Sequence, residues 1–496
     1  MELGLLLEMA VSADTDRVLV GRHEDGLTAA DLYRRARRGS RLISQAGATH
    51  VVFIAANGPA FPVALFAAAI AGVPMVPLNY RLPPEQLARL VEQNAPAMVI
   101  ADELVSAAVR LPAATVTPHA WLASVADGND DPGAGMGTVD ADDVALLLYT
   151  SGTTAEPKAA VLRHRNLSAY VLSTVEFASA GNAEATLVSV PPYHIAGVAN
   201  AVTNVYAGRR IVYLEAFTPQ DWLRTVRDES ITHALVVPTM LARIVEHLEG
   251  ADRADTPSLR SLAYGGAPMP RRVIERALEL FPDTGFVNAY GLTETSSTIA
   301  LLSPEDHRAV AASQDETVRS RLSSVGRAIP GIELQIRSDD GEPCQPGTAG
   351  QLWVRGEQVA GEYRGQTDTT DSWFCTRDQA RLDADGFLFI DGRVDDTIIR
   401  GGENIAPAEI EEVLLQHPQV ADVVVVGLPD EEWGQKIAAV IVARPGCQLA
   451  MDDVQAWARD KLRSSKTPQV LLQVDELPRT DTGKLLRRQI VAELVN

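Results

Sequence analysis

The feature that most constrains the fold is an alternation of short β-branched runs with helical patterns between about residues 28 and 290. The clearest examples are the apolar run 51–54, the helical pattern 61–71, the run 75–77, and the later segments 211–213, 222–227 and 234–237. Strands that alternate with helices pair in parallel, and helices then cover both faces of the sheet. The sequence therefore predicts an α/β fold built on stacked, mostly parallel sheets.

Two further regions follow this alternation. Short strands and glycine-rich turns predict a small β-rich subdomain at about 326–392. After Gly392-Arg-Val-Asp-Asp396 comes a second compact unit of helices and strands, with a length typical of an independent domain. We expect a large N-terminal domain at 1–394 and a small, mobile α+β C-terminal domain at 395–496.

Composition excludes several classes of protein. The formal net charge of −21 argues against a broad surface for nucleic acid or anionic membranes, because both require clustered Lys and Arg. The three cysteines lack metal-ligand spacing and predict free thiols in a reducing compartment. Prolines interrupt the most apolar stretch, 51–78, and the first residues lack a basic segment followed by an apolar run. We expect a cytoplasmic protein without a membrane span, as a monomer or homodimer.

The most informative motif is Tyr149-Thr-Ser-Gly-Thr-Thr-Ala-Glu-Pro-Lys158, which directly follows the apolar run 144–148. Hydroxyls, a glycine and one lysine at the end of a strand suit a phosphate cradle, in which backbone N–H groups and the ammonium bind the anion. The spacing fits neither the Walker pattern nor the dinucleotide glycine fingerprint. Taken alone, such a loop is more often a solvated turn. The candidate cradle residues are Thr150, Ser151, Gly152, Thr153, Thr154 and Lys158.

Four other segments give this cradle a chemical context. Gly265, Gly266 and Ala267 follow a short strand and could let the backbone approach a flat ring such as adenine. The segment Tyr290-Gly291-Leu-Thr293-Glu294 follows another strand, where Thr293 suits a phosphate and Glu294 suits Mg²⁺. The remaining candidates are Asp378 and Arg393 for the hydroxyls of a ribose, and Lys484 on a tight turn near the C-terminus.

Together these motifs resemble the adenylate-forming superfamily of acyl-CoA synthetases, aryl-CoA ligases, peptide-synthetase adenylation domains and luciferases. The resemblance runs from about residue 20 to the end, with eight motifs in the family's order. The motifs are the Thr-Ser-Gly-Thr-Thr loop, Pro191-Pro-Tyr-His194, Gly265-Gly-Ala267, Tyr290 to Glu294, Asp378, Gly392-Arg-Val-Asp395, Gly401-Gly-Glu-Asn-Ile-Ala-Pro-Ala-Glu409, and Gly483-Lys484.

The resemblance implies a two-step ligase. A carboxylate attacks the α-phosphorus of MgATP to give an acyl-adenylate and pyrophosphate, and a nucleophile, usually the thiol of CoA, then displaces AMP. Lys484 would bridge the substrate carboxylate and the α-phosphate, with Thr293, Glu294 and His194 as further catalytic candidates. Between the steps the C-terminal domain would turn about Asp395, so that the loop at Gly402 replaces Lys484.

The resemblance also suggests an acid pocket near Tyr193, His194, Val236, Ala289 and Ser297, suited to a small or medium acid. Within the family His194 gates this pocket rather than transferring protons. Trp433 is either an aromatic residue at the edge of the core or a contact for CoA.

Departures from the family pattern leave the acceptor open. Ala155, Ala159 and Arg377 stand where glycine is usual, and Ser465 and Gln469 replace an aromatic and a basic residue that a CoA nucleotide would use. Adenylation with a carrier-protein thiol, an amine or a nitrite-type nucleophile therefore stands beside CoA ligation. An inactive nucleotide-binding regulator is the alternative from a different class.

Overall fold

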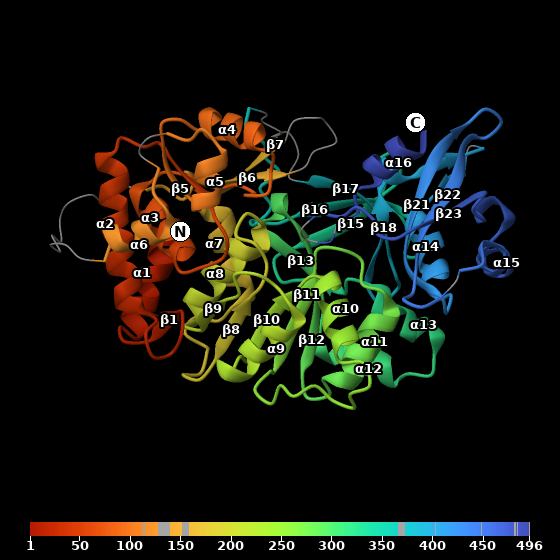
Figure 1. Ribbon diagram of the computed structural model, residues 1–496, viewed down its shortest axis with the longest axis horizontal. Coiled ribbons are helices and arrows are strands. Elements are labelled where there is room, and N and C mark those ends of the chain that lie inside the picture. The colour runs from red at the N-terminus through yellow and green to blue at the C-terminus, as the bar shows by residue number, and fades with distance from the viewer. Residues whose placement is uncertain are drawn as a thin grey trace.

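The computed structural model describes residues 1–112, 115–126, 139–150, 158–365, 373–401, 403–447, 449–480, 483 and 485–495. It is an α/β protein with a large N-terminal domain, in which helices and sheets form layers, and a small C-terminal domain (Figure 1). The predicted fold class is confirmed. Residues 151–157, which include most of the expected phosphate cradle, lie outside the described residues, as do Gly402 and Lys484.

The first large sheet has five strands in the order β5-β3-β4-β6-β7. Only β7 runs antiparallel to its neighbour. Its strands are β3 (His50–Ile54), β4 (Met75–Pro77), β5 (Ala97–Ala101), β6 (Val144–Thr150) and β7 (Lys158–Arg163). Four of the five residues of β3 are buried because helices cover both faces, which is why this strand reads as a continuous apolar run.

The second large sheet has nine strands in the order β14-β13-β12-β11-β10-β8-β9-β1-β2. Its central strands, β12, β11, β10, β8 and β9, are all parallel. The strands are β1 (Val18–Val20), β2 (Leu27–Thr28), β8 (Ala185–Val188), β9 (Arg210–Tyr213), β10 (His233–Val236), β11 (Ser261–Gly265), β12 (Gly285–Leu292), β13 (Ser297–Leu302) and β14 (Arg327–Ala328). The carboxyl ends of the parallel strands therefore meet at one edge, where α/β sheets bind ligands.

Helices form three layers around the two sheets. The middle layer buries its apolar residues against both sheets, and its helices are α1 (Leu3–Ala13), α2 (Ala29–Gln45), α3 (Ala60–Ala71), α6 (Pro118–Ser124), α7 (His164–Thr174) and α8 (Ile195–Ala207). The outer layers are α4 (Pro84–Gln93) and α5 (Glu103–Ala108) on the five-stranded sheet, and α9 (Pro219–Asp228), α10 (Pro238–His247) and α11 (Arg271–Leu280) on the nine-stranded sheet. Alternate residues of one strand enter different layers, since Val51 and Phe53 pack inward whereas Val52 and Ile54 pack outward.

A four-stranded antiparallel sheet forms the β-rich subdomain. Its strands are β15 (Glu333–Arg337), β16 (Gly350–Arg355), β17 (Phe374–Leu382) and β18 (Leu388–Arg393). The segments before it are α12 (Pro304–Ala312), α13 (Glu316–Arg319) and the 3₁₀-helix η2 (Ser320–Ser323), and the 3₁₀-helix η1 (Thr293–Thr295) precedes β13.

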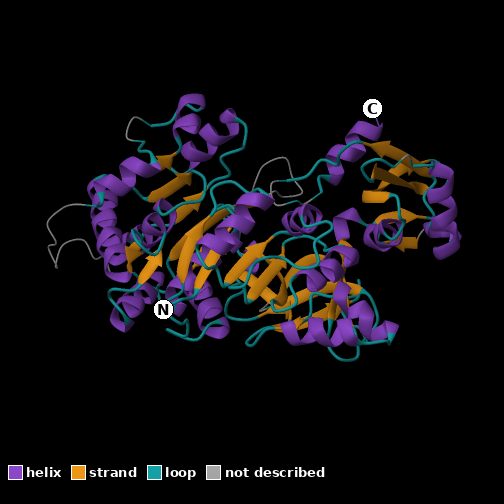
Figure 2. Ribbon diagram, turned by 60° about the horizontal axis from the view of Figure 1, so that its bottom comes forward, coloured by secondary structure: helices purple, strands orange, loops and turns teal. Residues whose placement is uncertain are grey.

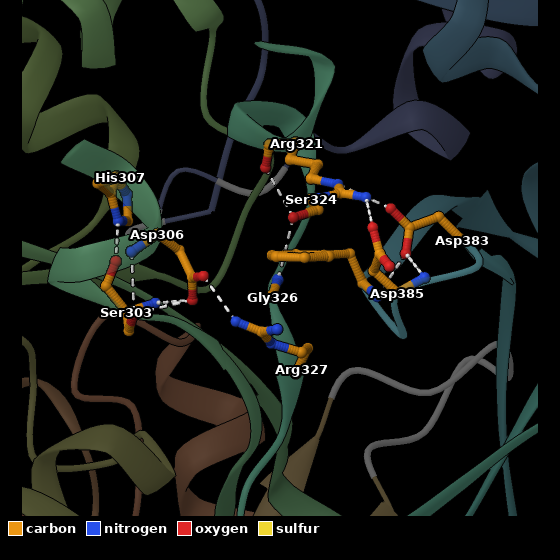
Figure 3. Close-up of polar contacts among 10 residues, drawn as sticks. Ser303, Asp306, His307, Arg321, Ser324, Gly326, Arg327, Asp383 and Asp385 are labelled. Carbon is orange, nitrogen blue, oxygen red and sulfur yellow. Dashed lines mark hydrogen bonds and ion pairs between the residues drawn. The ribbon is translucent and has the colours of Figure 1, made fainter. Parts of the chain in front are cut away.

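Arginines connect this subdomain to the nine-stranded sheet (Figure 3). Arg321 binds Asp383 at 2.9 Å and also Asp385, both in the turn before β18, and Arg327 of β14 binds Asp306 of α12 at 2.7 Å. The two guanidinium groups each lie 4.4 Å from the ring centroid of Phe387. These contacts join the two sheets through charged side chains as well as through apolar packing.

The C-terminal domain stands to one side of the main body (Figure 2). The chain leaves β18 through the 3₁₀-helix η3 (Val394–Asp396) and enters the hairpin β19 (Ile398–Arg400) and β20 (Glu403–Ile405). The rest comprises α14 (Pro407–Leu415), β21 (Val420–Asp430), β22 (Gly434–Ala443), α15 (Met451–Lys461), the 3₁₀-helix η4 (Ser464–Lys466), β23 (Val470–Val474) and α16 (Arg487–Val495). The expected boundary between 394 and 395 falls inside η3, and its action as a hinge stays a prediction.

Two observations concern the expected absence of a membrane span and the expected free thiols. Among the described residues, no helix combines the length and the apolar character needed to cross a bilayer. The thiols of Cys344, Cys375 and Cys447 are free.

Candidate functional site

A cleft of about 2110 Å³ opens at the carboxyl ends of the parallel strands and is bordered by both domains. Most of the predicted site residues that the structure describes line it. They are Thr150, Lys158, Tyr193, His194, Val236, Gly265, Gly266, Ala267, Ala289, Tyr290, Gly291, Thr293, Glu294, Ser297, Asp378 and Arg393. Residues from strands far apart in the sequence therefore meet in one place.

Asp378 is the centre of a buried polar group on β17. Its carboxylate accepts hydrogen bonds from the Tyr290 hydroxyl and, at 2.9 Å, from Arg393 Nη1. The side chain of Asp378 is 6% exposed. Burial raises the pKa of Tyr290 well above its ordinary value and the Asp378 charge adds to this, so Tyr290 remains a hydrogen-bond donor. Each carboxylate oxygen has two lone pairs, so Asp378 can still accept hydrogen bonds from a diol.

Glu294 lies in η1 and is buried at the cleft. Its Oε1 accepts a hydrogen bond from the hydroxyl of Tyr363, and its backbone carbonyl accepts from the N–H of Ala360 at 2.9 Å. Lys158 Nζ lies 5.8 Å from the Tyr363 ring centroid. Tyr363 is a site residue that the sequence prediction missed, because a lone tyrosine in a loop carries no spacing signal.

This arrangement fits a magnesium–nucleotide complex. No cluster of three or more candidate ligands occurs in the part of the chain that the structure describes. Mg²⁺ at nucleotide sites is commonly held by one or two carboxylates together with phosphates and water. Glu294, with one oxygen fixed by Tyr363, has the donor chemistry required.

The adjacent glycines at 265 and 266 are required for different reasons. A Cβ on Gly265 would lie 2.1 Å from the carbonyl oxygen of Ala289, so this glycine permits the close approach of two strands. Gly266 has φ of +85° and open space where a side chain would project. The positive φ favours glycine at 266, and the open space beside it leaves room for a flat ligand.

The five residues predicted for the acid pocket all border the cleft, and their side chains have different surroundings. Tyr193 and His194 pack against each other with ring centroids 4.6 Å apart. Val236 borders the cleft, but its side chain is fully buried in the apolar cluster beneath α9, α10 and α11. The hydroxyl of Ser296, next to Ser297, is buried and donates to Gln358 O at 2.7 Å.

The C-terminal turn reaches the cleft. A Cβ on Gly483 would lie 2.8 Å from the Thr239 side chain at the start of α10, so the turn lies directly against the N-terminal domain. Gly483 and Leu485, on either side of Lys484, both border the cleft. Lys484 itself is outside the described residues, and its role stays a prediction.

The loop that carries Gly401 occupies a different part of the C-terminal domain. The Gly401 N–H donates to Trp433 O at 2.8 Å, and a Cβ on Gly401 would lie 2.9 Å from the Trp433 ring. Trp433 is 45% exposed, and the Arg400 guanidinium lies 4.7 Å from its ring centroid. Neither Gly401 nor Trp433 belongs to the described lining of the cleft. The indole therefore supports this loop from the surface and is not a core residue.

Two departures from the expected motifs have structural consequences. Arg377 adopts φ of +60°, a left-handed conformation that costs a non-glycine residue free energy. Gln469 is committed to the backbone, because its Oε1 accepts from Ile437 N at 2.8 Å and its Nε2 donates to Thr467 O at 2.6 Å. Lys466 is bound to Glu409, with Nζ to oxygen distances of 2.6 and 2.9 Å.

Comparison with known proteins agrees with this geometry. A family model described as AMP-binding enzyme matches residues 7–364, and one described as AMP-binding enzyme C-terminal domain matches residues 409–484. A fatty acid–[acyl-carrier-protein] ligase, ScoC, of Streptomyces coeruleorubidus is 32% identical over 485 residues, which cover 94% of this chain and 91% of that protein. A feruloyl-CoA synthase of an Amycolatopsis species is 33% identical over 476 residues, with coverages of 94% and 93%.

Solved structures give the same result. The o-succinylbenzoate CoA synthetase MenE of Bacillus subtilis, in complex with its acyl-adenylate intermediate, is 27% identical, with a TM-score of 0.83 and coverages of 98% of this chain and 97% of that chain. The same enzyme with ATP and a magnesium ion has a TM-score of 0.82 at 26% identity, with coverages of 98% and 98%. The chain belongs to the AMP-binding enzyme family, and it is an enzyme of the AMP-forming acid–thiol ligase class.

Proposed function

We propose that this enzyme joins a small to medium carboxylic acid to AMP, releases pyrophosphate, and transfers the acyl group to CoA. The observation that carries the proposal is the meeting of the Asp378 group, Glu294 and the Gly483 turn at one cleft. A carboxylate is a poor acylating agent, and a mixed anhydride with phosphate supplies the leaving group that it lacks. Such chemistry depends on positioning and charge stabilisation.

The nucleotide roles follow from the donors and acceptors in place. Asp378 would accept hydrogen bonds from the ribose hydroxyls, while Arg393 and Tyr290 hold its carboxylate in position. The segment 265–267 would line the adenine. The loop 151–154 and Lys158 would bind the phosphates as an anion nest.

Charge stabilisation is assigned to three groups. Glu294 would hold Mg²⁺, which when bound neutralises phosphate charge, and Thr293 would donate to a phosphate oxygen. Lys484 would contact both the acid carboxylate and the α-phosphate, where negative charge is redistributed during attack. His194, beside Tyr193, would close the acid pocket.

Acyl transfer would use a second pose of the C-terminal domain. Asp395 is exposed in η3, between the β-rich subdomain and β19, where a change of a few dihedral angles would reorient the whole domain. The loop at Gly401 and Gly402, supported by Trp433, would then replace the Gly483 turn at the cleft and complete a channel for the pantetheine arm.

A carrier-protein thiol is the second candidate acceptor. The side chains of Gln469 and Lys466 are engaged within the C-terminal domain, so neither is free for a CoA nucleotide. A carrier protein presents the same pantetheine thiol without the adenosine phosphates that such side chains would bind. The ScoC relative acts on an acyl-carrier protein by name.

The test is a panel of carboxylic acids scored for pyrophosphate release with MgATP, repeated with CoA, with a pantetheinylated carrier protein and with amines. Thioester formation with CoA supports the leading proposal. AMP release that does not depend on CoA but is accelerated by the carrier protein would favour the carrier-protein thiol as the acceptor. Absence of pyrophosphate release with every acid would leave only a nucleotide-binding protein.

The hinge has its own test. Asp395→Pro is expected to preserve pyrophosphate release and to reduce thioester formation strongly, because proline fixes φ at one value. Asp395→Ala keeps the rotational freedom and is expected to retain both steps. Equal losses in both steps for the proline variant would contradict the two-pose account.

A further inference from the structure

The cleft continues as a channel between α8 and the nine-stranded sheet, towards the amino-terminal ends of β8, β10 and β11. The residues that line this channel become more polar with distance from the cleft. Strand register places Thr186, His233 and Ser261 side by side in one row across β8, β10 and β11. Two residues nearer the cleft, Leu235 and Ala263 form the next row. All five residues line the cavity. The deep row is polar and the row above it is apolar.

The facing helix repeats this gradient. In α8 the positions that line the cavity are Ile195, Ala196 and Ala199 nearer the cleft, and Asn200, Thr203 and Asn204 towards the C-terminal end. The opposite side of α8 supplies Val198, Val202 and Val205 to the apolar core. A helix buried on both sides would ordinarily carry apolar residues all round. The polar stripe therefore faces a space that contains hydrogen-bonding groups.

Arg209 lines this end of the channel and is paired with Glu184, while the largely exposed Arg260 lies 3.9 Å from Glu184. Arg209 Nε and Nη2 donate to Glu184 Oε2 at 3.1 and 3.0 Å, and Arg209 Nη1 donates to Asn204 Oδ1 at 2.9 Å. The two charged side chains are only 18% and 20% exposed. A second carboxylate on the substrate would therefore have to compete with Glu184 for a guanidinium that is already bound.

His233 contributes a neutral acceptor. Thr232 Oγ1 donates to Ala185 O at 2.9 Å, so its contact of 2.9 Å with His233 Nδ1 is satisfied when the ring donates from Nδ1. Burial, reinforced by Arg209, lowers the pKa of His233 to about 4. The ring is neutral at pH 7, and its Nε2 is left as an acceptor.

Asn200 supplies the complementary donor. Its Oδ1 accepts from Asn204 Nδ2 at 2.9 Å, which fixes the orientation of the amide through the bond of Asn204 to Arg209. The amide Nδ2 of Asn200 is thereby available as a donor. A hydroxyl both donates and accepts, so it suits a row that offers both kinds of partner.

We propose that the substrate acid has an apolar body and a neutral hydroxyl or phenol at the end remote from its carboxylate, bound among Thr186, Asn200, Thr203, His233 and Ser261. This inference rests on the proposed adenylation, because the carboxylate is placed at the nucleotide end of the channel. From the level of Gly265 to that of Ser261 is four residues along β11, about 13 Å. The channel therefore accepts an acid of medium length.

The experiment compares acids that differ only in an oxygen and a methyl group at the remote end. The pairs are 9-hydroxynonanoic with decanoic acid, and 4-hydroxycinnamic with 4-methylcinnamic acid. Each is measured by kcat/KM for pyrophosphate release and, independently, by calorimetric binding without ATP. The variants are the near-isosteric Thr203→Val with Ser261→Ala, and the control is Thr225→Val on α9, at the other face of the sheet.

The hydroxylated member of at least one pair is expected to be preferred about tenfold in both measurements. The Thr203→Val, Ser261→Ala variant should bring that ratio near unity with an unchanged circular dichroism spectrum, whereas Thr225→Val keeps it. Preference for the methyl acids, or a ratio of hydroxy acid to methyl acid that the double variant does not change, would contradict the assignment of a hydroxyl site at this end of the channel. Selective binding without pyrophosphate release would instead overturn adenylation and leave the channel assignment standing.

Discussion

The two faces of the nine-stranded sheet are built for different purposes. On the face covered by α9, α10 and α11, large apolar residues such as Leu262, Tyr264 and Phe286 are buried to 1% exposure or less. On the face towards α8, the alternate residues of the same strands, such as Ser261, Ala263 and Ala289, are mostly smaller or polar, and they border a cavity. The first face contributes hydrophobic stabilisation. The second face buries less apolar surface and contributes less, because it borders a binding site.

Backbone strain is also concentrated near the cleft. Five residues other than glycine have positive φ in the described chain, and three of them, Ser296, Ser297 and Arg377, lie at or beside the cleft. Such conformations persist only where the surrounding structure imposes them. This distribution indicates that the cleft is held in shape at some expense of stability.

The largest expected effect is on adenylation and concerns Lys484, at the nucleotide end of the cleft. Lys484→Ala should slow acid-dependent pyrophosphate release on the order of 10² to 10³ fold, by analogy with the loss of one donor to a developing negative charge. Its unfolding midpoint should be unchanged, because the role assigned to Lys484 is to contact substrate. An unaltered rate, measured by pyrophosphate release under saturating ATP, would contradict the assigned role.

The same substitution made on each face compares them directly. Val226→Ala, in α9 and in the packed cluster but not at the cleft, should lower the free energy of unfolding by about 2 kcal/mol and leave acid preference unchanged. Val287→Ala, which lines the cavity, should lower it by less and shift preference towards bulkier acids. Urea unfolding and an acid panel measure both quantities, and equal destabilisation without any shift in preference would remove the distinction between the faces.

His233, on the face of the sheet that borders the cavity, should make the free energy of unfolding depend on pH. The folded pKa of His233, about 4, is below its ordinary value of 6.5, so the unfolded chain binds a proton more readily. The contribution of this neutral histidine is therefore complete above pH 6.5 and is lost as the pH falls towards 4. Glu184, Arg209, Arg260 and Thr232 surround His233, and the neighbouring arginines add to the effect of burial.

His233→Gln should reduce the loss of unfolding free energy between pH 7.5 and 5.0, measured by urea denaturation. The exposed His119→Gln serves as the control, because its ring is in solvent. A loss in the His233 variant as large as in the native protein would show that this histidine is not a source of acid sensitivity.

The smallest expected effect concerns backbone strain. Arg377→Gly should raise the free energy of unfolding by about 1 kcal/mol, because glycine adopts positive φ without the Cβ penalty. Asp378, next in the chain, should keep its hydrogen bonds. A decrease in stability would mean that the arginine side chain stabilises the fold by more than the strain costs.

Periodicity and motif order predicted most of this molecule. The alternation of runs such as 51–54 and 61–71 specified parallel strands and covering helices, since each strand is short and buried on both faces. Motif spacing also selected Asp378 and Arg393, which prove to be hydrogen-bonded to each other. Local sequence carries this information because strands, turns and phosphate loops are local structures.

What the sequence did not predict depends on which face a side chain occupies. Val236 was predicted for the pocket and borders the cleft, but the pleat of β10 also buries its side chain in the packed cluster. Thr186, His233 and Ser261 come from three separate strands and form one row only through register. A signal was present, since polar residues alternate with apolar ones in parallel strands that should be buried on both faces. Tyr363 had no such signal, because its contact with Glu294 of η1 joins two segments that are distant in the sequence.

The measurement that tests the central claim most directly is acid-dependent exchange of labelled pyrophosphate into ATP by the purified protein with magnesium. The account predicts exchange that requires a carboxylic acid and needs no CoA or other acceptor, because the anhydride forms before any acceptor is used. Exchange that is absent with every acid, or that proceeds equally well without one, would contradict it.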